Sequence, residues 1–203
     1  MKQSTSNRKQ YAIILVAVVV LEFAFTCLIV RLVNNTHISQ MGKRGVQAAS
    51  YLLIIALSLV MTKLAGLSLR EIGVFKDRIG LQAGIGAGIT VLFVLLLLMT
   101  GWRPHDLTVH SFFSFALVGF SEELFSRGLV LKLLQELIHS GSKAVVIQAV
   151  IFGLFHLFIY QSISQCIIPF FIALIYGALR TEFLNTVGVF ALAIAHWLYD
   201  FLL

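Results

Sequence analysis

Ionisable residues interrupt an apolar stretch in the C-terminal half of the chain. Residues 121–128 read Ser-Glu-Glu-Leu-Phe-Ser-Arg-Gly, with apolar runs on both sides. Glu123 and Arg127 are four residues apart, so they can pair on one face of a helix, whereas Glu122 points about 100° away from that face. Glu122 must therefore find its partners on another helix.

Two further polar motifs follow in later apolar segments. Residues 152–156 read Phe-Gly-Leu-Phe-His, and residues 196–200 read His-Trp-Leu-Tyr-Asp, with His196 and Asp200 one helical turn apart. Counting from the segment ends at 1.5 Å per residue puts Glu122, His156 and His196 at roughly 6–16 Å from the same membrane face. We expect the three motifs to meet in one layer.

Such a layer is costly to bury. Insertion scales assign roughly 2.5–3.5 kcal/mol to each Asp, Lys or Arg at the membrane centre. A lone histidine such as His156 in an apolar helix is more often a structural residue, and a structural polar network is the alternative interpretation of the whole set. Two histidines, several carboxylates and an arginine at one depth nevertheless favour a functional site.

The elements that carry these motifs are apolar segments of membrane-spanning length. Hydrophobic residues make up 59% of the 203 residues and charged residues 12%, and the mean hydropathy is +0.96. Windows of ~20 apolar residues predict spanning helices, and they occur at about 11–30, 46–67, 79–100, 111–138, 144–160, 163–179 and from 185 to the C-terminus. The sequence predicts an all-α, polytopic transmembrane helix bundle of about seven spans, forming one domain over residues 1–203. The fourth segment is longer than a span requires, so we expect it to be tilted, broken or partly outside the bilayer.

The charged loops favour a lipid surface over nucleic acid. The formal net charge is +6, but the basic residues flank the spans and form no recognition motif, so anionic lipid head groups explain them. By a narrow margin, their distribution favours a cytoplasmic N-terminus. The first apolar segment is too long for a signal peptide and is predicted to be a retained span.

Two features of the N-terminal half have structural interpretations. Gly80, Gly84 and Gly88 repeat every four residues, which predicts a face for close helix packing. Glu22 and Lys63 lie in the first two spans, where they are expected to pair or to reach the interface, with a proton or ion path as the alternative.

The ordered set of motifs, Glu-Glu-x-x-x-Arg, Phe-x-x-x-His and His-x-x-x-Asp, resembles the CPBP family of intramembrane proteases. This family includes the type II CAAX prenyl endopeptidases, the bacteriocin-processing and bacteriocin-immunity proteins, and the Abi group. Residues 68–73, Ser-Leu-Arg-Glu-Ile-Gly, are similar to the family's lead-in. The resemblance therefore implies a CPBP/Abi-like catalytic core over residues 68–203.

The resemblance also implies roles for individual residues. The catalytic set would be Glu122, His156, His196 and Asp200, and the supporting set would be Glu123, Arg127 and Phe152. In this scheme Glu122 and His156 activate a water molecule, while His196 and residue 200 polarise the peptide carbonyl and stabilise the oxyanion.

Position 200 and the metal leave alternatives open. Many relatives have Asn where this chain has Asp200, and an ionised Asp cannot donate a hydrogen bond to an oxyanion. Asp200 is therefore either protonated or orients His196. Zinc is the alternative to a metal-free mechanism, with Glu122, His156 and His196 as its ligands, but the pattern His-Glu-x-x-His is missing, so we favour the metal-free mechanism without a cofactor.

The expected function is that of an intramembrane endopeptidase in a bacterial plasma membrane. Its substrate would be a membrane-associated peptide or membrane protein, such as a prenylated CAAX-type tail or a bacteriocin or pheromone leader. A non-catalytic bacteriocin-immunity or scaffold protein of the same fold is the alternative. A proton-coupled transporter is a third, but the internal repeats expected of it are not evident.

Overall fold

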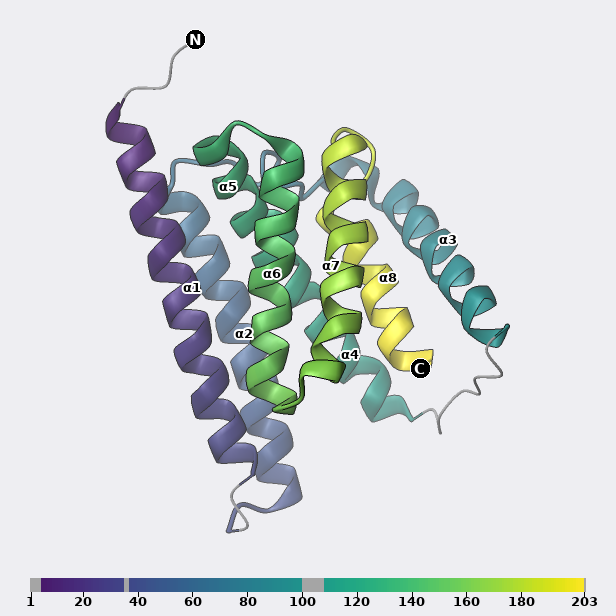
Figure 1. The fold of residues 1–203 in the computed structure, drawn as a ribbon. Helices are drawn as coiled ribbons and strands as arrows, with labels where there is room; N and C mark the ends of the chain where they lie inside the picture. Colours follow the sequence, from purple (N-terminus) through teal and green to yellow (C-terminus); the bar gives the residue numbers. More distant parts are fainter. Residues whose placement is uncertain (1–4, 35–36, 100–107, 203) are drawn as a thin grey trace.

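Helices are the only regular secondary structure in the described part of the chain. The computed structural model describes residues 5–34, 37–99 and 108–202, and these contain no strand. The elements are α1 (Thr5–Val33), α2 (Gln40–Leu64), the 3₁₀ turn η1 (Lys76–Arg78), α3 (Ile79–Leu98), α4 (Val109–Glu123), the π-helical η2 (Leu124–Val130), α5 (Leu131–Ile138), α6 (Gly141–Tyr160), α7 (Ile163–Glu182) and α8 (Val189–Leu202) (Figure 1). The predicted all-α class is confirmed.

All seven apolar segments are helical, and two of them differ from plain spans. In the described residues, α1, α2, α3, α6 and α7 are each long and apolar enough to cross a membrane, and α8 is a shorter apolar helix. The fourth segment is broken into α4, η2 and α5. This break explains why the segment is longer than one span requires. The chain is therefore a multi-pass membrane protein whose site segment contains a π-helical turn, a form that is rare and frequent at functional sites.

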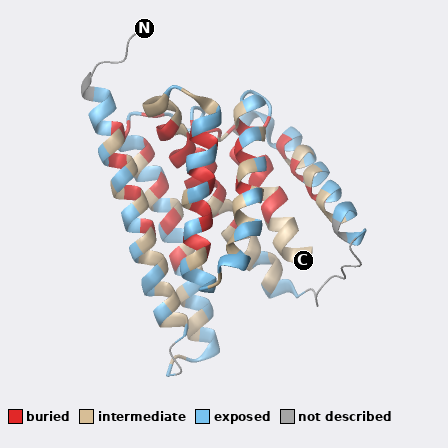
Figure 2. Cartoon of the chain, in the orientation of Figure 1, coloured by how far each residue is buried: buried red, intermediate tan, exposed pale blue. Residues whose placement is uncertain are grey.

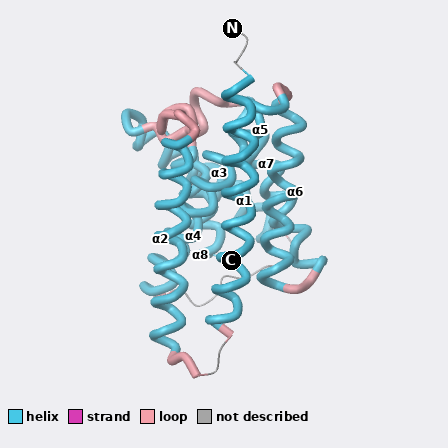
Figure 3. Tube along the Cα trace, turned by 90° about the vertical axis from the view of Figure 1, so that its left-hand side faces the viewer, coloured by secondary structure: helices cyan, strands magenta, loops and turns pink. Residues whose placement is uncertain are grey.

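The broken segment lies in the middle of the bundle. In Figure 1, α1 and α2 form one side, α3 forms the other, and α6 and α7 lie in front of α4 and α8. The view in Figure 3, turned by 90°, shows the helices running up and down with loops at both ends. Buried residues gather in the central helices, while the outer faces of α1 and α3 are largely exposed (Figure 2). Every residue of η2 is buried, so the site is enclosed by the bundle.

The prediction for the glycine repeat is wrong. A Cβ added to Gly80, Gly84 or Gly88 would meet nothing within 4 Å, whereas a Cβ on Gly86 would lie 2.6 Å from the carbonyl oxygen of Ala191 in α8. The packing face of α3 is instead defined by its polar side chains. Gln82 donates to the carbonyl of Thr186 and accepts from the amide of Gly188, because a buried amide side chain requires partners.

The segment that resembles the family's lead-in forms turns between α2 and η1. The amide and hydroxyl of Ser68 both donate to Glu71 Oε2, at 2.7 and 2.6 Å, and these hydrogen bonds lower the pKa of the Glu71 carboxyl. Gly73 has φ +88°, and its carbonyl accepts from the amide of Val189 at 2.9 Å. The lead-in thus anchors the first residue of α8, the helix that carries His196 and Asp200.

Candidate active site

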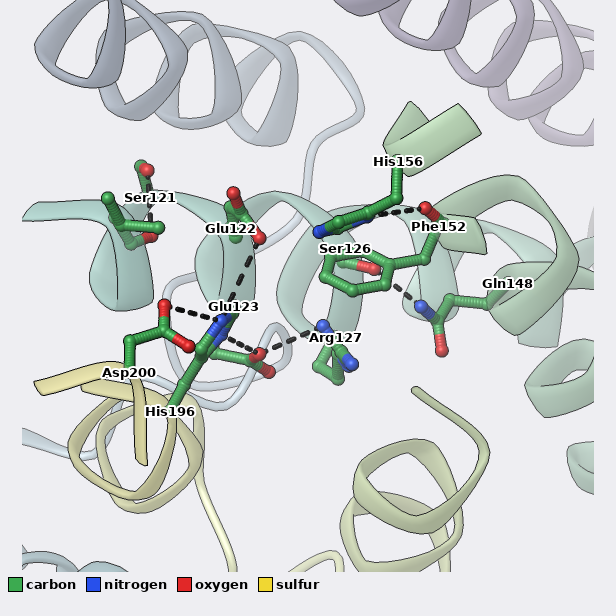
Figure 4. Close-up of polar contacts among 11 residues, drawn as sticks. Ser121, Glu122, Glu123, Ser126, Arg127, Gln148, Phe152, His156, His196 and Asp200 are labelled. Carbon is green, nitrogen blue, oxygen red and sulfur yellow. Dashed lines mark hydrogen bonds and ion pairs between the residues drawn. The ribbon is translucent and has the colours of Figure 1, made fainter. Parts of the chain in front are cut away.

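A buried ion pair joins α4 to η2 and continues to α8. Arg127 Nη1 donates to Glu123 Oε1 at 2.9 Å, and neither side chain has exposed surface. His196 Nδ1 lies 2.9 Å from the same oxygen and donates to it (Figure 4). The expected pairing of Glu123 with Arg127 is confirmed, and Glu123 additionally positions His196.

The ring of Phe152 lies at the centre of the site. Its centroid is 4.3 Å from the guanidinium carbon of Arg127, 4.6 Å from the ring centroid of His156 and 6.5 Å from that of His196. The contact with Arg127 has cation–π geometry. Phe152 therefore supports the arginine and both histidines with a single side chain.

The backbone of Phe152 defines the tautomer of His156. Its carbonyl oxygen lies 2.9 Å from Nδ1 of His156. Because a carbonyl only accepts hydrogen bonds, Nδ1 carries a proton, and Nε2 of the neutral ring is left as an acceptor. His156 thus presents an acceptor nitrogen to the cavity that it lines.

Glu122 faces away from the ion pair, as the helical spacing predicts. Its Oε2 is buried and has no hydrogen-bond partner among the described residues, and it lies 3.9 Å from Nε2 of His196. Figure 4 shows Glu122 between His156 and the pair formed by His196 and Asp200. Three helical segments therefore bring their polar side chains to one point around a carboxylate with a free oxygen.

Asp200 lies beside His196 rather than apart from it. Its Oδ2 is 3.4 Å from Nε2 of His196, so each ring nitrogen of His196 faces a carboxylate oxygen. An imidazolium with two N–H donors satisfies both contacts. Of the two roles expected for Asp200, this arrangement favours the orientation of His196.

The possible zinc ligands lie near one another, but they are not arranged as a metal site. Within the described residues, no three His, Cys, Asp or Glu side chains form a group that could hold a metal ion. His196 Nδ1 faces Glu123, and its Nε2 faces Asp200 at 3.4 Å. The alternative set of Glu122, His156 and His196 therefore does not fit a zinc site in this arrangement.

Two features of the site were not expected from the sequence. Gln148 donates to the hydroxyl of Ser126, and both residues are buried, so α6 is tied to η2 beside the ion pair. The only sequence signal for this contact was Gln148 itself, a glutamine inside an apolar span.

The second feature is Glu22, which lines the same cavity as Glu122 and His156. Its expected pairing with Lys63 is wrong. Lys63 is exposed, and Gln10 donates to the carbonyl of Leu64, so the end of α2 lies about three helical turns from Glu22.

Comparison with known proteins finds a family match in the C-terminal region that contains the three motifs. Residues 104–202 match the family model described as type II CAAX prenyl endopeptidase Rce1-like, a range that includes all four expected catalytic residues and all three supporting residues. No curated protein and no solved structure matches the chain. The start of the catalytic core at residue 68 stays a prediction. The match over residues 104–202 supports the resemblance of the three motifs to CAAX-type intramembrane proteases.

Proposed function

We propose that the chain is an intramembrane endopeptidase that hydrolyses a peptide bond of a membrane-associated substrate with water activated by Glu122. One observation carries the proposal. The side chains of Glu122 and His156 line one cavity of about 210 Å³, and Oε2 of Glu122 has no hydrogen-bond partner among the described residues. A water molecule that enters this cavity meets two acceptors, the carboxylate of Glu122 and Nε2 of His156.

The proposed attack needs no further reactant. Glu122 takes a proton from water while the second proton is held by Nε2 of His156, and the water oxygen forms a bond with the carbonyl carbon of the substrate. Glu122 then returns its proton to the peptide nitrogen as the carbon–nitrogen bond breaks. General base catalysis of this kind contributes typically about 10²–10⁴-fold to a rate.

His196 is suited to stabilise the oxyanion. Its Nδ1–H is held by Glu123 at 2.9 Å, while its Nε2 lies near Glu122 and Asp200. When protonated, Nε2 donates to the developing negative charge on the substrate oxygen. A donor that is already oriented in a site without bulk water contributes strongly to transition-state stabilisation.

The cavity favours a substrate with an apolar chain. Most of its lining side chains are aliphatic or aromatic, and they come from α1, α2, η2 and α6: Ile29, Val30, Val33, Tyr51, Ile54, Phe125, Phe152, Phe155 and Ile159. Together with the family match, this wall supports a prenylated CAAX-type tail as the substrate, with a bacteriocin or pheromone leader as the second candidate. We place the enzyme in a bacterial plasma membrane.

The proposal is tested by comparing protein N-termini in host membranes that contain equal levels of four chains. These are the wild type and the variants Glu122→Gln, His156→Ala and Glu182→Gln. Glu182 is exposed at the end of α7, so its variant is the matched control. We expect new N-termini beside membrane segments with the wild type and the control, and their loss with Glu122→Gln and with His156→Ala. Identical profiles for all four chains would overturn the proposal. A Glu122→Gln chain that still protects its host against a bacteriocin would instead indicate a binding protein.

A further inference from the structure

Glu22 faces the interior of the protein from a helix outside the matched region. The buried face of α1 is formed by Tyr11, Ile14 and Val18, and Glu22 continues this face one turn further along the helix. It is only 7% exposed. A carboxyl therefore occupies a position at which the pattern of α1 calls for an apolar side chain.

Aromatic packing holds Glu22 against the site. Its neighbour Phe23 lies 4.2 Å from the ring of Phe155 and 5.1 Å from that of Phe158, measured between centroids. Phe155 belongs to the same helix as His156. This contact determines which face of α1 is turned toward α6, so Glu22 is presented to the cavity that contains Glu122.

One carboxyl oxygen of Glu22 lacks a hydrogen-bond partner in the part of the chain that the structure describes. This oxygen, Oε2, is buried. A buried polar atom without a partner costs free energy, and the Glu22 side chain lines a cavity of about 210 Å³. A donor group on a bound molecule would remove that cost.

The charges around the cavity are unbalanced. Its described lining includes two acidic side chains, Glu22 and Glu122, and no Lys or Arg. The two cationic side chains beside Glu122, Arg127 and His196, are already engaged, since both are held by Glu123. The cavity therefore favours the binding of a positively charged group over that of a negatively charged one.

The remaining walls fit the stem of a long basic side chain. Tyr51, Phe125 and Phe155 line the space, and aromatic and aliphatic walls pack well against the methylenes of Lys or Arg. Basic side chains of the protein itself lie in a neighbouring cavity, which is lined by Lys43 and Arg44 and shares Tyr51 with this one.

We propose that Glu22 is a specificity-determining residue that binds a Lys or Arg side chain of the substrate close to the scissile peptide bond. This inference rests on the proposed function, because it assigns a part of the substrate to the same cavity. The two proposals depend on different residues, because Glu22 takes no part in the proposed chemistry.

The test measures binding separately from cleavage. The probes are fluorescent farnesylated peptides that are identical except for Lys, Gln or Glu next to the scissile bond. Their affinity is measured by anisotropy with the Glu122→Gln chain in proteoliposomes. We expect the Lys peptide to bind about tenfold or more tighter than the Gln peptide, which corresponds to about 1.4 kcal/mol, and the Glu peptide to bind most weakly. Adding Glu22→Gln should bring the ratio of Lys to Gln affinity close to one, while adding Glu182→Gln should leave it unchanged.

Two results would overturn the inference. One is equal binding of the Lys and Gln peptides by the chain with Glu22 intact, a result that needs no folded Glu22 variant. The other is a preference for Lys that survives Glu22→Gln. If the wild-type chain binds the Lys peptide selectively but cleaves none of the peptides, the proposed function fails while the role of Glu22 in binding stands.

Discussion

Removing the buried cation should destabilise the bundle more than any surface change. Arg127 is 1% exposed, its Nη1 pairs with Glu123 at 2.9 Å, and its guanidinium lies over the rings of Phe152 and Tyr176. Arg127→Met removes these contacts and leaves the Glu123 carboxylate buried beside His196 alone. Breaking a buried pair in this way costs about 3–5 kcal/mol.

The assay is thermal unfolding in detergent micelles, followed by the loss of helical circular dichroism. At about 2–4 °C per kcal/mol for a chain of this size, we expect Arg127→Met to lower the midpoint by about 6–20 °C. The matched control is Arg70→Met, which changes an exposed arginine in the lead-in and should stay within about 0.5 kcal/mol of the wild type.

A double variant separates the charge from the packing. Glu123→Gln combined with Arg127→Met leaves a neutral amide in place of an unpaired carboxylate, so the cost should fall to about 1–3 kcal/mol. Equal midpoints for Arg127→Met and Arg70→Met would refute the reasoning. A double variant that melts below Arg127→Met would show that the charge on Glu123 is not what destabilises the single variant.

Three further predictions follow from other contacts. Gly86→Leu should cost about 1–3 kcal/mol because an added side chain meets α8, whereas Gly84→Leu should be nearly neutral; equal melting midpoints would contradict the packing of α3. Gln148→Leu leaves the buried hydroxyl of Ser126 without its donor and should cost about 1–3 kcal/mol, measured as a lower melting midpoint. Ser68→Ala should cost less than about 1 kcal/mol at pH 7, because Glu71 is exposed. Because folding lowers the pKa of Glu71, this difference is present above the unfolded pKa and lost as the pH falls through the folded pKa. A difference that persists below the folded pKa would be inconsistent with the bond between Ser68 and the ionised carboxylate.

Spacing within a helix was enough to predict the local geometry of the site. The pairing of Glu123 with Arg127 follows from their separation of four residues, and the direction of Glu122 away from that pair follows from the 100° turn between successive residues. These relations depend only on helix geometry, so they can be derived from a single sequence.

Relations between helices were harder to predict. The repeat of Gly80, Gly84 and Gly88 has the same local pattern as a packing face, but the hydrogen-bonding needs of Gln82 determine which side of α3 turns inward. Likewise, the place of Glu22 beside the site depends on how α1 packs against α6. The sequence shows a carboxyl in a span, and only the tertiary structure shows what it faces.

The π-helical turn η2 also changes the direction in which the side chains before and after it point. Its wide turn, in which the amide of Leu131 donates to the carbonyl of Ser126, contains one residue more than an α-helical turn between the same points. Removing one residue between Glu122 and Gly128 would rotate Gly128 and everything beyond it by about 100° relative to Glu122. Gly128, which lies against the carbonyl of Ile72 in the lead-in, would then turn away from it. The extra residue of η2 thus lets one helical segment turn Glu122 toward the catalytic partners and Gly128 toward the lead-in.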